Sequence, residues 1–198
     1  IDDAPRLIGI IDGEMRLDVR VEEERQLIWG DGDSGDLEGL FEQGVEAQEF
    51  DRAVQGDSLI DTIRRMRTDL RKRRVTPNAV LVDPLDWENI ELAKGAATGN
   101  DHYIWGLVST LRGPMIWSMT VVESDALEAA DESRRLLMGD FIRGATLFDR
   151  HDVRLAVGFI DDDFGRNLRT LRAEERVALG VKRPWAFTWT ETAEASSS

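Results

Sequence analysis

The N-terminal part of the chain carries its apolar residues at helical spacing, with charged residues on the remaining faces. The apolar stripe consists of Ile8, Ile11, Met15 and Val19. Pro5 suits a first helical turn, and the glycines and aspartates of residues 30–33 provide a stop. The pattern predicts a helix over residues 5–29, roughly 37 Å long at about 1.5 Å per residue. This is longer than an average globular helix, so we expect a strut across the molecule.

Helical and strand patterns then alternate. Residues 31–56 are rich in glycine and acids and predict a loop, after which Asp57 and Ser58 can cap a second helix. The apolar positions of that helix are Leu59, Ile63, Met66 and Leu70, and Pro77 closes the segment. Residues 78–82 predict a short buried strand, followed by a third helix that Asp83 caps and Gly95 ends.

Beyond Gly113 the pattern favours strands. The predicted strands are residues 114–122, 136–142, 145–148, 153–159 and 168–190. In the last of these, apolar residues alternate with charged ones, which predicts a long strand or ribbon with one packed face and one wet face. The apolar set is Leu171, Ala173, Val177, Leu179 and Val181, and the charged set is Arg172, Glu174, Arg176 and Lys182. Helices and strands together indicate a mixed α/β or α+β layer arrangement.

Composition limits the class of protein. The chain has 198 residues, of which 41% are hydrophobic and 32% charged, as is usual for one or two globular domains. The 39 acids against 25 bases give a net charge of −14, which argues against a dedicated nucleic-acid reader. The chain has no Cys and two His, so thiolate chemistry is excluded and histidine metal sites are poorly supplied. No apolar run approaches the ~20 residues of a membrane span.

Charge is distributed unevenly. Residues 1–57 carry 17 acids and 5 bases, a net of −12, whereas residues 61–74 carry a net of +5. Opposite patches on one chain favour self-association in a fixed orientation. Charged helix faces in water explain the pattern equally well.

Two acidic clusters are candidate metal ligands. Residues 31–36 read Asp-Gly-Asp-Ser-Gly-Asp with Glu42 at the twelfth position, which is similar to a calcium loop. Gly35 and Asp36 stand in the reverse of the order that such a loop needs, so an acidic turn is favoured. Residues 161–163 are three consecutive aspartates, and a turn between strands accounts for them without a metal.

No catalytic set emerges from the other residue types. His102 and His151 are far apart and interpreted as surface or turn residues. The chain contains no nucleophile elbow, Walker A loop or dinucleotide-binding glycine motif. The six Trp residues are assigned to cores and interfaces.

Several segments resemble, in the same order along the chain, the major capsid proteins of tailed phages of the Hong Kong 97 type. The C-terminal third reads FIRGATLFDR over residues 141–150, RNLRTLRAEERVAL over residues 166–179 and RPWAF over residues 183–187. Residues 77–87, PNAVLVDPLDW, resemble the family's strand and following helix. Residues 2–32 resemble its spine helix and glycine turn, whereas residues 98–113 depart most from the family.

The resemblance implies an α+β Hong Kong 97-like fold of two parts. A peripheral domain would combine the spine helix, residues 1–39, with terminal strands over residues 150–198, and an axial domain would occupy residues 40–149. The family's N-terminal arm and extended loop precede the spine helix. We therefore expect this sequence, which begins Ile1-Asp2-Asp3, to start within a longer protein.

The resemblance also implies a function. It is that of a structural, non-enzymatic shell protein of a phage or prophage, which assembles in the bacterial cytoplasm into icosahedral heads that enclose DNA. Expected partners are further copies of the chain in pentamers and hexamers, with scaffold, portal and head protease as additional candidates. DNA would be contacted only non-specifically, and no membrane, cofactor or resident metal is expected. One alternative is an encapsulin-type nanocompartment shell. The other is a metal-dependent enzyme using Asp31, Asp33 and the aspartates of residues 161–163.

Some members of that family join subunits by an isopeptide bond between a Lys and an Asn, assisted by a Glu. Asn167 and Glu174 fall at the positions of that Asn and that Glu. The nucleophilic Lys belongs to the extended loop, which Lys72, Lys94 and Lys182 do not match. A turn-forming role for Asn167 and cross-strand ion pairs for Glu174 remain open alternatives.

Overall fold

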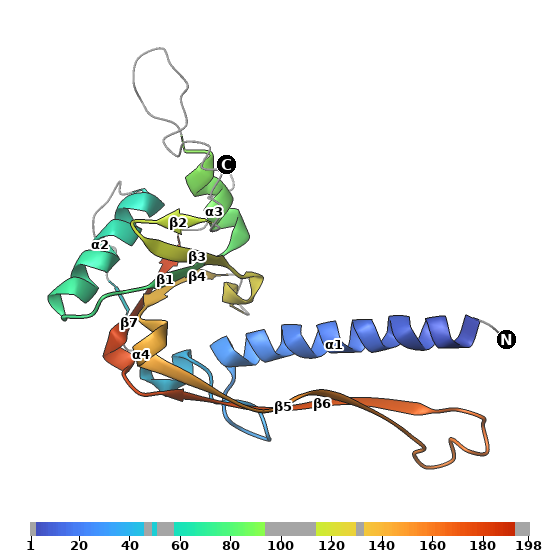
Figure 1. Ribbon diagram of the computed structural model, residues 1–198. Coiled ribbons are helices and arrows are strands. Elements are labelled where there is room, and N and C mark those ends of the chain that lie inside the picture. The colour runs from blue at the N-terminus through green and yellow to red at the C-terminus, as the bar shows by residue number, and fades with distance from the viewer. Residues whose placement is uncertain (1–2, 46–48, 51–57, 94–113, 130–132, 193–198) are drawn as a thin grey trace. The chain divides into compact units, whose positions relative to one another are not determined.

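The structure is a computed structural model, and it describes residues 3–45, 49–50, 58–93, 114–129 and 133–192 (Figure 1). The chain divides into two compact units. Unit 1 comprises Ile1–Gly39 and Leu147–Gly180, and unit 2 comprises Leu40–Thr146 and Val181–Ser198.

Unit 1 consists of one long helix and most of a two-stranded ribbon. Helix α1 covers Asp3–Trp29, so the helix predicted over residues 5–29 is confirmed. Strands β5 (Ala145–Gly158) and β6 (Thr170–Val181) form the ribbon. An Arg16 Nη1 donates to the carbonyl oxygen of Val153 at 2.9 Å, which ties the helix to β5.

The ribbon differs from the predicted strands in two ways. The predicted strands 145–148 and 153–159 are joined in the single strand β5, which ends at Gly158, because the intervening charged residues lie in exposed strand rather than in a turn. The strand predicted over residues 168–190 is split, because Pro184 begins a short 3₁₀ turn, Pro184–Ala186, between β6 and β7 (Phe187–Thr192). Within β6 the predicted alternation is confirmed, since residues 171–179 alternate between more exposed charged positions and more buried positions, Leu171 excepted.

Unit 2 is built on a five-stranded sheet of order β2-β3-β1-β4-β7. Its other strands are β1 (Ala79–Val82), β2 (Met115–Ile116), β3 (Met119–Glu123) and β4 (Arg134–Gly139). Strand β1 pairs in parallel with β3 and antiparallel with β4, and β4 pairs antiparallel with β7. The single strand predicted over residues 114–122 is instead the β2–β3 hairpin, because Trp117 and Ser118 form a tight turn with φ values of 46° and 65°.

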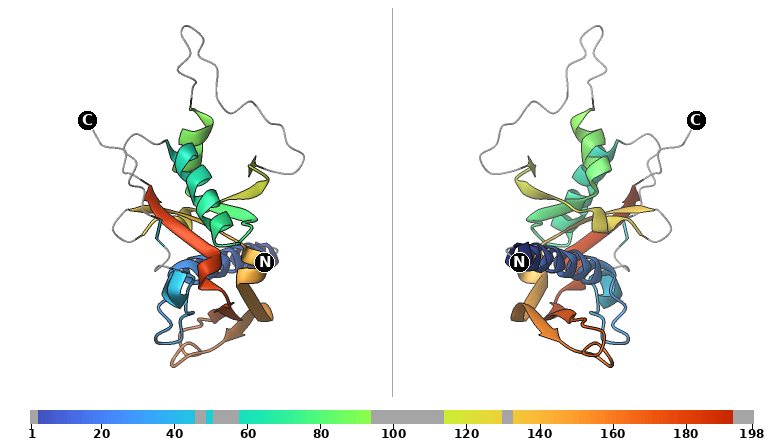
Figure 2. Two further views of the ribbon diagram at one scale, coloured as in Figure 1. Left: turned by 90° about the vertical axis from the view of Figure 1, so that its left-hand side faces the viewer. Right: turned by 90° about the vertical axis from the view of Figure 1, so that its right-hand side faces the viewer.

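Two helices accompany the sheet (Figure 2). Helix α2 (Leu59–Lys72) begins with a capping box, in which Ser58 Oγ accepts from Asp61 N and Asp61 accepts from Ser58 N. Helix α3 (Pro84–Glu91) is capped by Asp83 as predicted. It ends at Glu91 with Leu92 as its C-cap, several residues before the predicted stop at Gly95, which lies outside the described residues.

The expected peripheral domain, residues 1–39 and 150–198, and the first compact unit differ at the C-terminal end. Residues 181–198 group with unit 2, and the reason is backbone pairing: β7 joins β4 over six residue pairs, from Arg134 with Thr192 to Gly139 with Phe187.

Strand β4 is also shorter than predicted. Asp140 caps a short helix, α4 (Phe141–Gly144), where the sequence pattern predicts continued strand.

The ring of Phe187 sets the packing at this end of the sheet. It is fully buried and contacts Phe141 edge to face, with ring centroids 5.1 Å apart. A Cβ atom on Gly139 or Gly144 would lie 2.3 Å or 2.5 Å from the ring, so only glycine fits at either position. The close approach of the Phe187 ring explains why the FIRG motif has glycine at position 144.

Candidate functional site

Unit 1 presents an exposed apolar surface along its ribbon. Large apolar side chains at least one-third exposed are Leu147, Phe148, Val157, Phe159, Ile160, Phe164, Leu168 and Leu171. Phe164 is the most exposed, at 81%, and its ring packs edge to face on Phe159 at 5.9 Å. A surface of this kind is typical of protein–protein contacts.

Asp163 fixes the turn between β5 and β6 by accepting hydrogen bonds, and we call this turn the ribbon tip. Its Oδ2 accepts from Ile160 N at 2.9 Å and from Thr170 Oγ1 at 2.6 Å. Both hydrogen bonds lower the pKa of the Asp163 carboxyl, and the bond from Thr170 has the larger effect. Asp162 pairs with Arg166 at 2.7 Å. The tip is therefore a hydrogen-bonded turn in which two of the three aspartates already have partners.

The acidic residues named as metal ligands do not form a metal site. Asp31 Oδ1 accepts from Asp33 N at 2.9 Å within the turn after α1, while residues 161–163 lie at the ribbon tip. Within the described ranges, no group of three or more acidic or histidine side chains could hold a metal ion. The metal-enzyme alternative consequently has no site in this part of the chain.

Asn167 and Glu174 both lie on exposed parts of the ribbon. Asn167 occupies the turn before β6 with a φ of 57°, a conformation that Asn tolerates better than most residues. Glu174 lies on the exposed face of β6 and pairs with Arg172 at 3.2 Å. Lys72 and Lys182 are exposed in unit 2, and Lys94 lies outside the described residues.

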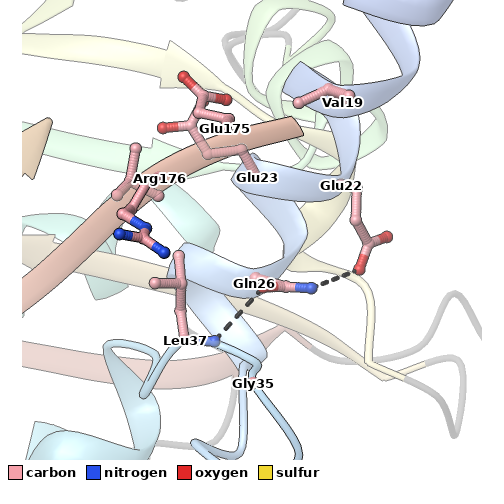
Figure 3. Close-up of a pocket in the computed structure, with 9 residues that line it drawn as sticks. Val19, Glu22, Glu23, Gln26, Gly35, Leu37, Glu175 and Arg176 are labelled. Carbon is pink, nitrogen blue, oxygen red and sulfur yellow. Dashed lines mark hydrogen bonds between the residues drawn. The ribbon is translucent and has the colours of Figure 1, made fainter. Parts of the chain in front are cut away.

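A cavity of about 340 Å³ lies in unit 1 between α1, the turn that follows it and β6 (Figure 3). Its lining residues are Val19, Glu22, Glu23, Gln26, Gly35, Leu37, Glu175, Arg176 and Val177. Gln26 connects the walls, since its Nε2 donates to Glu22 at 3.0 Å and its Oε1 accepts from Leu37 N at 3.3 Å. Glu22 is also held by Arg25, and this hydrogen bond is the main cause that lowers the pKa of Glu22.

Glu175 is the unusual group of this cavity. It lies on the more buried face of β6, and its Oε2 is buried without a hydrogen-bond partner among the described residues. Burial raises the pKa of Glu175, and the neighbouring carboxylates of Glu23, Asp149 and Asp152 raise it further, against a smaller opposing effect of Arg20. The sequence pattern did not lead us to Glu175. The available signal was that this charged residue occupies the odd-numbered series of β6, whose other positions are apolar.

Unit 2 contains a second feature that the sequence did not reveal. The Arg135 guanidinium lies 4.2 Å from the Trp189 ring centroid and 5.0 Å from that of Phe41, and these two rings pack edge to face. Phe41 belongs to the short helical turn Phe41–Val45, within the segment predicted as loop. The cation and both rings thus fasten this turn to β4 and β7.

The histidines and tryptophans of the described residues lie in helices, strands and turns. His151 lies in the middle of β5 rather than in the predicted turn, and His102 lies outside the described residues. Trp87 and Trp189 are buried as expected for core residues, whereas Trp117 and Trp185 are partly exposed. None of the helices in the described residues is long and apolar enough to cross a membrane.

This arrangement, a long helix beside a ribbon and a five-stranded sheet with flanking helices, is the Hong Kong 97-like capsid fold. A solved capsid of an empty GTA particle matches 93% of this chain and 66% of its own, with a TM-score of 0.64 at 15% identity. The SrpI encapsulin of Synechococcus elongatus PCC 7942 shares the fold, with 14% identity, a TM-score of 0.59 and coverage of 94% of this chain and 67% of its own.

Sequence comparison identifies the family. The model of the phage capsid family matches residues 1–191, and the major capsid protein of Enterobacteria phage HK97 is 30% identical over 188 residues, or 94% of the chain. The chain belongs to the phage capsid family. It spans 47% of the length of the HK97 protein.

Proposed function

We propose that the protein is the major capsid subunit of a tailed phage or prophage and forms the wall of a closed head. The observation that carries this proposal is the family match over residues 1–191, together with 30% identity to a protein named as a major capsid protein. The exposed apolar ribbon supports it, because a shell subunit works through its edges rather than through a cleft. The role is structural, without catalytic turnover.

The arrangement we propose is cyclic, with copies of the chain in pentamers and hexamers. The capsid of the empty GTA particle is described with C5 symmetry, which supports a five-fold ring. In the assembled head, unit 1 would supply most of the peripheral part and unit 2 the axial part. Scaffold, portal and head protease are the further proteins that such a head needs, and its assembly would take place in the host cytoplasm.

Electron microscopy of the complete gene product, with any residues that flank these 198, tests the proposal. We expect closed particles of one diameter that protect their DNA from nuclease. A complete protein that stays monomeric at high concentration contradicts the proposal. Particles of uniform size that hold a protein cargo and no DNA favour the encapsulin alternative, which the shared fold supports.

Covalent cross-linking through Asn167 and Glu174 is a separate proposal within this function. The positions of these residues on exposed parts of the ribbon make both accessible to a neighbouring subunit. In the reaction, a Lys amine of another subunit attacks the Asn167 carboxamide carbon, Glu174 accepts the amine proton, and ammonia leaves as the new amide forms.

Denaturing gel electrophoresis and mass spectrometry of assembled particles test the cross-link. We expect ladders of covalent oligomers and a Lys–Asn167 peptide pair lighter by one ammonia. Asn167→Ala and Glu174→Gln should each abolish the ladder while particles still form. Monomers alone from mature wild-type particles show that Asn167 only shapes its turn.

A further inference from the structure

Helix α2 has one face in the core of unit 2 and the opposite face in solvent. The inward side chains of Ile63, Met66 and Leu70 are fully buried. Besides one exposed acid, Asp61, the solvent face carries four exposed bases, Arg64, Arg65, Arg71 and Lys72. We call these four residues the basic face of α2. In a chain with a net charge of −14, such a concentration of positive charge is a local exception.

An exposed tryptophan lies beside this face. Trp117 is 36% exposed at the β2–β3 turn, and the Arg64 guanidinium lies 6.0 Å from its ring centroid. Its φ of 46° places the backbone in the left-handed region, which a bulky residue adopts only at a cost. Trp and Arg are the residue types that contribute most to protein–protein contacts, so a fixed Trp–Arg pair is a suitable centre for one.

The complementary charge lies on the same chain, in unit 1. The turn after α1 carries the exposed acids Asp31, Asp33, Asp36 and Glu38, which we call the acidic turn. No base occurs between residues 26 and 51. The backbone of the turn is fixed, since Gly32 N donates to Leu37 O at 3.0 Å and Gly39 N donates to Gly30 O at 2.8 Å. Both surfaces are thus ordered in advance, which lowers the entropic cost of binding.

We propose that the basic face of α2, with Trp117, binds the acidic turn of a second copy of this chain. The inference rests on the proposed function, because a cyclic ring needs a contact between two different surfaces of neighbouring subunits. Charge complementarity selects this pair of surfaces. Copies with a net charge of −14 repel one another, and joining a basic surface to an acidic one reduces this repulsion where the subunits touch.

A charge-reversal cycle on the complete protein tests the contact. Arg64→Glu/Lys72→Glu places acid against acid, and Asp33→Lys/Asp36→Lys places base against base. We expect each pair to lower the fraction of assembled protein in sedimentation velocity at least about tenfold, since like charges across an interface cost several kcal/mol. The combined four-residue variant, which restores the net charge of −14, should recover assembly.

The matched control reverses two exposed bases on β5. Arg150→Glu/Arg154→Glu combined with Asp33→Lys/Asp36→Lys also has a net charge of −14 but leaves no complementary pair, and it should not recover assembly. Equal recovery in the control means that net charge alone matters, which overturns the inference. The inference also fails if the Arg64/Lys72 pair assembles normally and loses only retained DNA, which would assign the face to nucleic acid.

Two further outcomes are distinguishable. A lower melting temperature of the unassembled Arg64/Lys72 variant, with no recovery in the combined variant, shows a role within one chain and contradicts the proposal. Failure of the unaltered protein to assemble removes the proposed function and this inference together. Normal assembly of the unaltered protein and of both reversed pairs removes the inference alone.

Discussion

The two units of the chain are held together in different ways. Among the described residues, the buried apolar side chains belong almost entirely to unit 2, and only Ile28 and Val153 belong to unit 1. Unit 1 instead exposes apolar residues along α1 and the ribbon, such as Ile10, Leu17 and Phe148. Unit 2 therefore has a core of its own, while unit 1 leaves apolar surface for other partners to cover.

Under the proposed function, unit 2 would be the stable body of a shell subunit and unit 1 the edge that neighbouring subunits cover. A helix beside a two-stranded ribbon buries little area, and an isolated ribbon is marginal in water. If neighbouring copies complete the burial, assembly and the ordering of unit 1 become linked. Substitutions in the unassembled chain test this division of roles.

The core of unit 2 should be sensitive to truncation in a way that the ribbon is not. Leu137 of β4 is fully buried, so Leu137→Ala should lower the free energy of unfolding by about 2–5 kcal/mol. Leu147→Ala removes the same atoms from a side chain that is 48% exposed, and should cost less than about 1 kcal/mol. Urea titration of both variants measures the difference, and equal losses would refute the contrast between the units.

Glycine-to-alanine substitutions should also lower stability more in unit 2 than in unit 1. Gly144→Ala forces a methyl group against the Phe187 ring and should cost about 1–3 kcal/mol. Gly158→Ala in the exposed part of β5 meets nothing within 4 Å and should be neutral or slightly stabilising. Thermal unfolding of the pair checks the prediction. A tolerated Gly144→Ala would mean that the aromatic packing around Phe187 is looser than the structure shows.

The cation between Trp189 and Phe41 should contribute to the stability of unit 2. Arg135→Lys keeps the charge but loses the flat guanidinium surface, and should cost about 0.5–2 kcal/mol. Arg154→Lys, at an exposed position on β5, is the control and should change little. Urea unfolding of both variants measures the loss of stability, and no change for Arg135→Lys would show that the rings alone hold the turn at Phe41.

The smallest effect concerns pH and belongs to unit 1. Because the pKa of Glu175 is raised in the folded state, its stability contribution is full below the ordinary pKa of 4.5 and is lost as pH rises through the raised value. Glu175→Gln should therefore raise the melting temperature near neutral pH, and the gain should shrink on acidification. Glu174→Gln removes the same charge from the exposed face of β6 and serves as the control. An equal gain at every pH would contradict this account.

Groups with a lowered pKa act in the opposite direction. The carboxyls of Glu22, Asp61 and Asp163 are favoured in their charged form by hydrogen bonds, so their contribution is present at neutral pH and is lost on acidification. The total pH dependence of the chain therefore mixes both signs. For this reason the melting temperatures of variant and parent should be compared at each pH.

Local signals in the sequence predicted the main elements correctly. Helix α1, the capped helices α2 and α3, strand β1 and the alternation of β6 follow from periodicity, Ser58, Asp83 and Pro84. These features depend on residues close together in the chain, whose hydrogen bonds and side-chain spacing are fixed by the order of amino acids alone. The family resemblance, carried by ordered motifs, was likewise available without coordinates.

The tertiary structure decided what depends on distant partners. Only pairing with β4 assigns β7 to the sheet of unit 2, and only packing on Phe187 explains why residue 144 must be glycine. The stacked Arg135 had no distinct signal, and the place of Glu175 in the alternation of β6 did not by itself show that its carboxyl is buried, because burial and ring contacts arise from segments far apart in sequence. Local patterns thus determine which elements form, whereas long-range contacts determine where each element lies and which side chains it buries.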